Sequence, residues 1–292
     1  REPWRIPRIE PSLKGWTQPY KGVEGMRLHV FDTGSIDAPE GLLFRGGNWL
    51  EPRSLPVLAF VVEHPDAGLV VFDTGFSQAI ADDAQGFLGS FMSRVVKPVL
   101  AEGGTLGQQM AASGLESKEV SHVVLSHMHF DHTGALEEFS GAVVVIASSE
   151  RNDAEAEHWP LDGFIESDWD EVSRWAEIDY AAEAPYATFI AHHDLLGDGS
   201  LVLIDLRGHT AGSQGMIVML PAGPVLITGD AAWTEESWRY AARPMMAHDM
   251  DLWWEQIWRV KKFVQLVPAT LVMPGHDRRR LEDITREDVV LH

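Results

Sequence analysis

Hydrophobic residues in this chain fall mostly in short runs rather than in long amphipathic stretches. The runs are rich in β-branched residues and end at Gly, Pro or Asp, which is typical of strands. A first series is predicted at residues 26–34, 57–64, 68–75, 121–126 and 142–147, and a second at 200–208, 215–220, 223–230 and 269–275. Helical spacing predicts helices at about 87–102 and 251–265, the latter with Asp251 as its N-cap. Two series of strands, each closed by a helix, predict two packed sheets with helices outside.

Three further segments shape this outline. Residues 1–24 are rich in proline and are expected to form an arm on the surface, and residues 25–292 are expected to form one domain. Within that domain, residues 148–187 are strongly acidic and contain Trp159, Trp169 and Trp175. We expect an exposed helical insertion there, whose tryptophans pack onto the body. Residues 210–229 carry no charge, but Pro221 and Pro224 favour two short buried strands over a membrane span.

The net charge and the absence of cysteine limit the binding partners and the kinds of metal site that the chain can have. The 292 residues include 23 Lys and Arg against 44 Asp and Glu, a formal net charge of −21, which opposes binding to nucleic acid or to an anionic membrane. With no cysteine, the chain has no disulfide and no thiolate metal site, so any metal must be held by histidine and carboxylate. The compartment stays open: cytoplasmic, or secreted or periplasmic if a leader preceded Arg1.

The stretch "SHMHFDHTG", residues 126–134, concentrates metal-binding side chains. His127, His129, Asp131 and His132 occupy six positions directly after an apolar run. In an extended segment, two residues that are two positions apart point to the same side, so His127 and His129 would face one small volume. A single histidine is more often not a ligand, but four such residues at the end of a predicted strand favour a metal site.

Three later residues extend this group. His209, Asp230 and His276 each follow a predicted strand and are flanked by glycine. Loops at strand ends are where a rigid scaffold displays chemical groups. The remaining histidines lack this context and are predicted not to be ligands: His29, His64, His122, His158, His192, His193, His248 and His292.

The order "HMHFDH", a lone His, a lone Asp and a final "GH" resembles the metallo-β-lactamase superfamily, over about Met26 to His276. The resemblance implies an α+β fold, an αββα sandwich of two mixed sheets with helices on both outer faces. It also implies two divalent metal ions, zinc first, with iron, manganese or cobalt as alternatives. By position, His127, His129 and His209 would bind one ion, Asp131, His132 and His276 the other, and Asp230 both. Asp73 in "VVFDTG" resembles the aspartate that orients a ligand histidine.

Such a site implies hydrolysis. A water held between two metals becomes a hydroxide near neutral pH, because its pKa falls toward about 7. This bridging hydroxide would attack a polarised carbonyl while Asp131 orients it and carries a proton. Asp131 and Asp230 are therefore the expected catalytic carboxylates.

Within the superfamily, "RLHVFDTG", "LPVLAFVVEHPDAGLVVFDTG" and "SHMHFDHTGAL" look most like the N-acyl homoserine lactone lactonases, the quorum-quenching branch. The implied substrate is a neutral lactone with an apolar tail. Those lactonases usually carry a tyrosine three residues after the bridging aspartate, where this chain has Trp233. We expect Trp233 and Phe130 to bind the substrate, Trp233 chiefly by packing.

Other functions remain open. An organophosphate triester or aryl ester would suit the same site, and a glyoxalase II-like thioesterase would need basic residues, for which Arg278–Arg280 is the one dense cluster. A non-catalytic metal-binding protein is disfavoured, because structural zinc usually takes four ligands at one ion. The expected partner is a small neutral molecule, with no nucleic acid and no membrane span, and a homodimer is left open.

Overall fold

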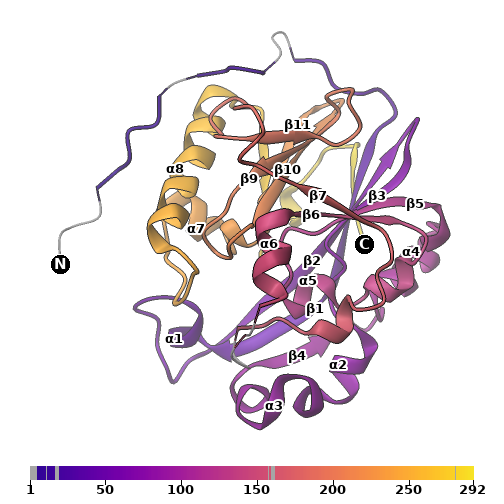
Figure 1. Cartoon of the computed structure of the whole chain (residues 1–292), viewed down its shortest axis with the longest axis vertical. Coiled ribbons are helices and arrows are strands. Elements are labelled where there is room, and N and C mark those ends of the chain that lie inside the picture. The colour runs from indigo at the N-terminus through magenta and orange to yellow at the C-terminus, as the bar shows by residue number, and fades with distance from the viewer. Residues whose placement is uncertain (1–4, 11, 17–19, 157, 159–161, 280) are drawn as a thin grey trace.

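A computed structural model describes residues 5–10, 12–16, 20–156, 158, 162–279 and 281–292, and the chain folds around two packed β-sheets (Figure 1). In the first sheet the order is β13-β1-β2-β3-β5-β6-β7, and β4 also pairs with β1. Its strands are β1 (Arg27–Pro39), β2 (Pro52–His64), β3 (Gly68–Phe72), β4 (Lys97–Leu100), β5 (Val120–Val124), β6 (Val143–Ala147), β7 (Trp175–Ile178) and β13 (Val289–Leu291). The strands β3, β5, β6 and β7 run parallel, whereas β1, β2 and β3 are antiparallel neighbours, so the sheet is mixed.

The second sheet has the order β12-β11-β10-β9-β8. Its strands are β8 (His192–Asp194), β9 (Leu201–Asp205), β10 (Gln214–Leu220), β11 (Gly223–Ile227) and β12 (Leu271–Met273). The β11–β12 pair is parallel and the other pairs are antiparallel, so this sheet is mixed too. The uncharged segment 210–229 forms β10 and β11, as predicted.

The main core lies between the two sheets. Because successive side chains of a strand point to opposite faces, Val124 of β5 packs toward the second sheet, whereas Val123 and Leu125 pack toward the outer helices. From the second sheet, Met216 and Ile227 belong to the same central cluster as Val124. A fully buried side chain of this size contributes roughly 1.5–3 kcal/mol relative to an exposed one.

Helices cover the outer face of each sheet (Figure 1). Leu106 and Met110 of α4 pack onto the first sheet, and Val260 and Phe263 of α8 pack onto the second. The helices are α1 (Glu40–Leu43), α2 (Gln78–Asp82), α3 (Ala84–Val95), α4 (Leu106–Ala112), α5 (Phe130–Thr133), α6 (Ser148–Ala154), α7 (Glu235–Tyr240) and α8 (Met250–Leu266). Short 3₁₀ turns lie at η1 (Ser117–Glu119), η2 (Leu136–Phe139), η3 (Glu166–Asp168), η4 (Gly229–Ala231) and η5 (Leu281–Asp283). The predicted αββα sandwich is confirmed.

The two predicted helices need correction at their ends. The first, expected at 87–102, ends at Val95 as α3, and residues 97–100 form β4 against β1. Pro98 explains the difference, because proline has no N–H to donate within a helix and disfavours the helical conformation of the residue before it. The second helix begins at Met250, and its N-cap is Asp249 rather than Asp251: the Asp249 carboxylate accepts the N–H groups of Asp251 and Leu252.

The expectation of a helical insertion at 148–187 is wrong for most of that segment. Among its described residues, helix is confined to α6 and η3, and β7 instead adds a parallel strand to β6. The hydrogen-bonding edge of β6 decides this, since pairing at a sheet edge outweighs weak local helix preference. Trp169 is buried against the first sheet and Trp175 is half-buried there, as expected for packing tryptophans. Trp159 lies outside the described residues.

The described part of the N-terminal arm runs along the second sheet and α8 (Figure 1). Trp16 is buried, with its ring centroid 5.3 Å from that of Phe263. The Trp254 indole donates a hydrogen bond to the Arg5 carbonyl at 2.8 Å. Across the described residues, none of the helices combines the length and the apolar character that crossing a membrane requires.

Candidate metal centre

The predicted ligands all follow strands, and the strands end at one edge of the sandwich. Strands β3 and β5 are parallel neighbours, so Asp73 and His127 leave the first sheet at the same end. In the second sheet β9, β11 and β12 share one direction, and His209, Asp230 and His276 follow them. The topology therefore brings residues from distant parts of the sequence to one place.

The segment from Ser126 to His132 changes conformation at its middle. His129 is extended (φ −73°, ψ 154°) and precedes the single turn of α5, which carries Asp131 and His132. His129 thus comes from extended backbone, and Asp131 and His132 come from a helical turn. Gly229 lets the Asp230 loop approach this segment: it has a φ of +48°, and a Cβ there would lie 2.6 Å from the Ser126 Cβ.

His127, His129 and His209 form a first group, in which the candidate ligand atoms lie within 4.8 Å of one another. The His127 Nε2 and His129 Nδ1 atoms are 2.9 Å apart, and the His209 Nε2 is 3.3 Å from the same His129 atom. Burial, together with the neighbouring imidazoles, lowers the pKa of His127 and of His209, and lowers that of His129 to about 3. These rings are therefore neutral, the state in which imidazole binds a metal.

Asp131, His132 and His276 form a second group within the same limit. The Asp131 Oδ2 lies 3.4 Å from the His132 Nε2 and 3.6 Å from the His276 Nε2. Burial alone would lower the pKa of His132, but the charges of Asp131, Asp73 and Asp230 outweigh it and raise that pKa well above its usual value. This group is rich in negative charge, which favours a cation.

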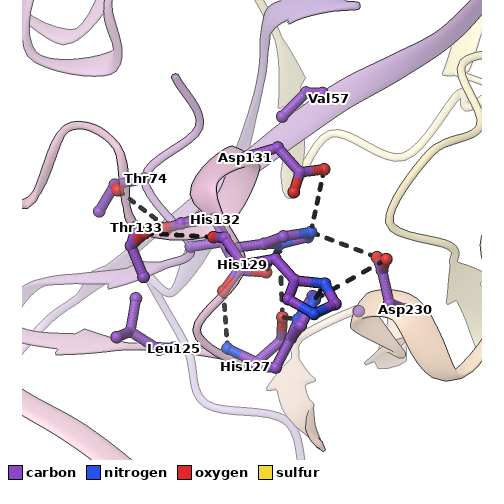
Figure 2. Close-up of polar contacts among 12 residues, drawn as sticks. Val57, Thr74, Leu125, His127, His129, Asp131, His132, Thr133 and Asp230 are labelled. Carbon is purple, nitrogen blue, oxygen red and sulfur yellow. Dashed lines mark hydrogen bonds and ion pairs between the residues drawn. The ribbon is translucent and has the colours of Figure 1, made fainter. Parts of the chain in front are cut away.

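Asp230 lies between the two groups and turns one oxygen toward each (Figure 2). Its Oδ2 is 3.3 Å from the His209 Nε2, and its Oδ1 is 3.0 Å from the His276 Nε2 and 3.3 Å from the His132 Nε2. Burial opposes ionisation of Asp230, yet the charges of His276 and His132 hold its pKa well below the usual range. A carboxylate in this position has the geometry to serve two ions.

Buried polar atoms that lack partners test whether metals fit. The His132 Nε2 and the Asp230 Oδ1 are buried 3.3 Å apart, and among the described residues neither makes a contact with the geometry of a hydrogen bond. Such atoms are normally paired, because an unpaired one costs about 1–3 kcal/mol. Both atoms face the centre of the cluster, where a divalent cation would satisfy them. Histidine and carboxylate donors also suit zinc, iron, manganese and cobalt. The residues of the cluster therefore fit the divalent metal ions that the sequence implies.

Neighbouring groups fix which ring nitrogen faces the centre. The Asp73 Oδ2 accepts a hydrogen bond from the His132 Nδ1 at 2.8 Å, and its Oδ1 accepts the Ser126 N–H at 2.6 Å. The His276 Nδ1 donates to the Pro56 carbonyl at 2.7 Å. Each ring therefore keeps a proton on Nδ1 and turns its Nε2 inward, which is the orientation that ligand histidines require.

The two expected substrate-binding residues lie in different surroundings. The Trp233 indole is half-buried and donates its N–H to the Asp230 Oδ2 at 2.7 Å, while its ring lies 5.8 Å from that of His209. Phe130 is buried and stacks on Phe76 at 6.1 Å, within an apolar cluster below α5.

The histidines predicted not to be ligands belong to none of the clusters found among the described residues. Sequence reasoning missed Glu150, which is buried beside the first group and has no local motif to mark it.

Two histidine-rich groups with a carboxylate between them, at the edge of an αββα sandwich, are typical of a metallohydrolase. A family model described as the metallo-β-lactamase superfamily matches residues 53–276, and the chain belongs to this superfamily. The family and the enzyme class predicted from the sequence are confirmed.

Three lactonases are similar to this chain in sequence or in structure. The chain is 32% identical over 257 residues to the N-acyl homoserine lactonase AttM of Agrobacterium fabrum, covering 86% of this chain and 93% of AttM. A variant of Bacillus thuringiensis AiiA with N-decanoyl-L-homoserine bound at its active site has a TM-score of 0.76 at 19% identity, covering 89% of this chain and 97% of that one. The dizinc quorum-quenching lactonase AidC, in complex with a product, has a TM-score of 0.61 at 14% identity, covering 88% of each chain.

Proposed function

We propose that this chain opens N-acyl homoserine lactones to the corresponding hydroxy acids. The observation that carries the proposal is Asp230, whose two oxygens face two separate ligand groups, in a chain similar to AttM over most of its length. A centre for two ions suits hydrolysis of a neutral carbonyl compound, and the net charge of −21 makes an anionic substrate unfavourable.

The ligand roles follow the two groups. His127, His129 and His209 would hold one divalent ion, and Asp131, His132 and His276 the other. Asp230 would contact both, and zinc is the ion we expect first. When bound, the ions would activate a water for attack and would polarise the lactone carbonyl.

The side chains of the protein have distinct tasks in this reaction. Asp131 lies beside His132 and His276, and we assign it to orient the attacking water, take its proton and return a proton to the leaving ring oxygen. In balance, one water adds, the C–O bond of the ring breaks, and a carboxylic acid and an alcohol form. Trp233, half-buried against the centre, would pack the lactone or its acyl chain, and Phe130 would support the apolar wall beneath it.

A substrate panel tests the proposal. Purified protein would be given N-hexanoyl and N-decanoyl homoserine lactones, an aryl ester, a phosphotriester, a glutathione thioester and a β-lactam, with proton release followed for the lactones. We expect kcat/KM for an acyl lactone to exceed that for every other class. If phosphotriesters or aryl esters turn over efficiently and no acyl lactone does, the substrate is wrong while the metal site stands.

A further inference from the structure

Glu150 is a fully buried acid that the reaction above does not use. It lies in the first turn of α6, with 0% of its surface exposed. Placing a carboxylate in the interior is costly unless hydrogen bonds compensate, so its partners indicate why it is there. Those partners belong to the two loops that carry the first ligand group.

Each oxygen of Glu150 holds one of these loops. Its Oε1 accepts the N–H of Met128, the residue between His127 and His129, at 3.0 Å. Its Oε2 accepts the N–H of Gly212, three residues after His209, at 2.8 Å. One carboxylate therefore links the backbone that carries two of the three histidines to the backbone that carries the third.

The close fit around Glu150 makes this link rigid. A Cβ at Gly212 would lie 2.4 Å from the Glu150 backbone nitrogen and 2.7 Å from its Cβ, so the loop can approach α6 only with glycine at this position. The same loop is closed by Thr210, whose N–H donates to the Ser213 hydroxyl at 3.0 Å. The loop that carries His209 is thus held by Glu150 and by its own hydrogen bond between Thr210 and Ser213.

The second ligand group has a different support. Asp73 accepts hydrogen bonds from Ser126 and from the His132 ring, as described above. Glu150 contacts the loops of the first group, and Asp73 contacts a ligand of the second. Glu150 is therefore the carboxylate that joins the His127–His129 segment to the His209 loop, and Asp73 is the one that accepts the N–H of the His132 ring.

We propose that Glu150 is a positioning residue for the three-histidine group, setting the separation of His209 from His127 and His129 and so the metal affinity of that site in particular. The inference rests on the two-metal site of the proposed function but not on its substrate. Removing a group that orients ligands typically costs 10–100-fold in metal affinity.

The test compares Glu150→Gln with the wild type by zinc competition against a chromophoric chelator, which resolves the two binding steps. In the variant an amide NH₂ faces one of the two backbone N–H groups, so one support is lost. We expect the affinity of one site to fall about 10–100-fold and that of the other to change less than about 3-fold. Glu155→Gln is the matched control, because Glu155 follows the same helix and makes a surface ion pair with Arg151; it should bind zinc as the wild type does.

Asp73→Asn identifies which site is affected. Asp73→Asn should weaken the binding step of the group that contains His132, and the cobalt absorption spectra of the Asp73→Asn and Glu150→Gln variants should differ. If Glu150→Gln weakens both steps equally, or neither, the positioning role is wrong. A purely structural role would lower the melting temperature of the metal-free protein and leave the ratio of the two affinities unchanged.

Glu150→Asp decides the matter if the glutamine variant does not fold. It keeps the charge but shortens the reach by one methylene, so a smaller loss confined to the same site is expected. Wild-type protein that binds no metal would overturn both this inference and the proposed function. Wild-type protein that binds two metals and opens no lactone would overturn the substrate alone.

Discussion

Trp233 offers a direct test of how the Asp230 carboxylate is held. The change Trp233→Phe keeps an aromatic ring beside Phe44, whose centroid lies 5.6 Å away, but removes the indole N–H. That N–H donates to the Asp230 Oδ2 at 2.7 Å. The variant therefore separates the hydrogen bond of the indole from its packing.

The expected magnitude follows from the contact. Hydrogen bonds to charged groups contribute about 1.5–3 kcal/mol when buried. Asp230 is buried but the indole is half-buried, so water can partly replace the donor and the lower end applies. About 1.4 kcal/mol corresponds to about a 10-fold loss in kcat/KM. Because packing is retained, the loss should appear in kcat, with KM changing less than about 2-fold.

Steady-state kinetics on an acyl homoserine lactone measure this effect. Trp233→Tyr keeps a donor and should retain substantial activity, whereas Trp233→Ala also loses packing and should raise KM. Trp238→Phe is the control, since Trp238 packs against the second sheet and α8, away from the ligand groups. An unchanged kcat with a raised KM in Trp233→Phe would refute the role of the hydrogen bond and leave packing alone.

Two further outcomes are expected. Elemental analysis should find close to two transition metals per wild-type chain and fewer in Asp230→Ala, with activity lost in parallel; a variant that keeps both ions would contradict the bridging role. Burial raises the pKa of Asp168 to about 7, against an opposing hydrogen bond from Thr133. The folded state therefore resists ionisation of this acid, and the stability associated with its proton is lost as pH rises through about 7. Asp168→Asn should raise the melting temperature at pH 8.5 relative to wild type, by an amount that shrinks toward pH 4; a difference independent of pH would contradict this reasoning.

The fold and the clustering of the seven candidate ligands could be predicted because each depends on a signal that is local in the sequence. His127 to His132 form one dense motif, and His209, Asp230 and His276 each mark the end of a β-branched run. Strand direction then brings these ends together without any further information. The sequence also shows that Trp233 departs from the lactonase pattern, but not that its N–H points at Asp230.

What the sequence could not show depends on contacts between distant residues. Glu150 acts through backbone N–H groups 22 and 62 positions away, and backbone donors leave no trace in residue types. The strand at 97–100 forms because β1 offers it an edge for pairing. Pro98 is a local signal against helix, but it does not by itself predict a strand. In the same way β7 depends on the free edge of β6, which outweighed the acidic, helix-like composition of residues 148–187.

The division of the ligands between the two sheets has a consequence for biosynthesis. A nascent chain that has reached residue 200 already contains His127, His129, Asp131 and His132, yet each candidate group still lacks a member that comes later. Capture of metal by the proposed groups would therefore wait until His209, Asp230 and finally His276 have been translated and the second sheet has docked. The enzyme would acquire its ions only after both sheets have formed and packed together.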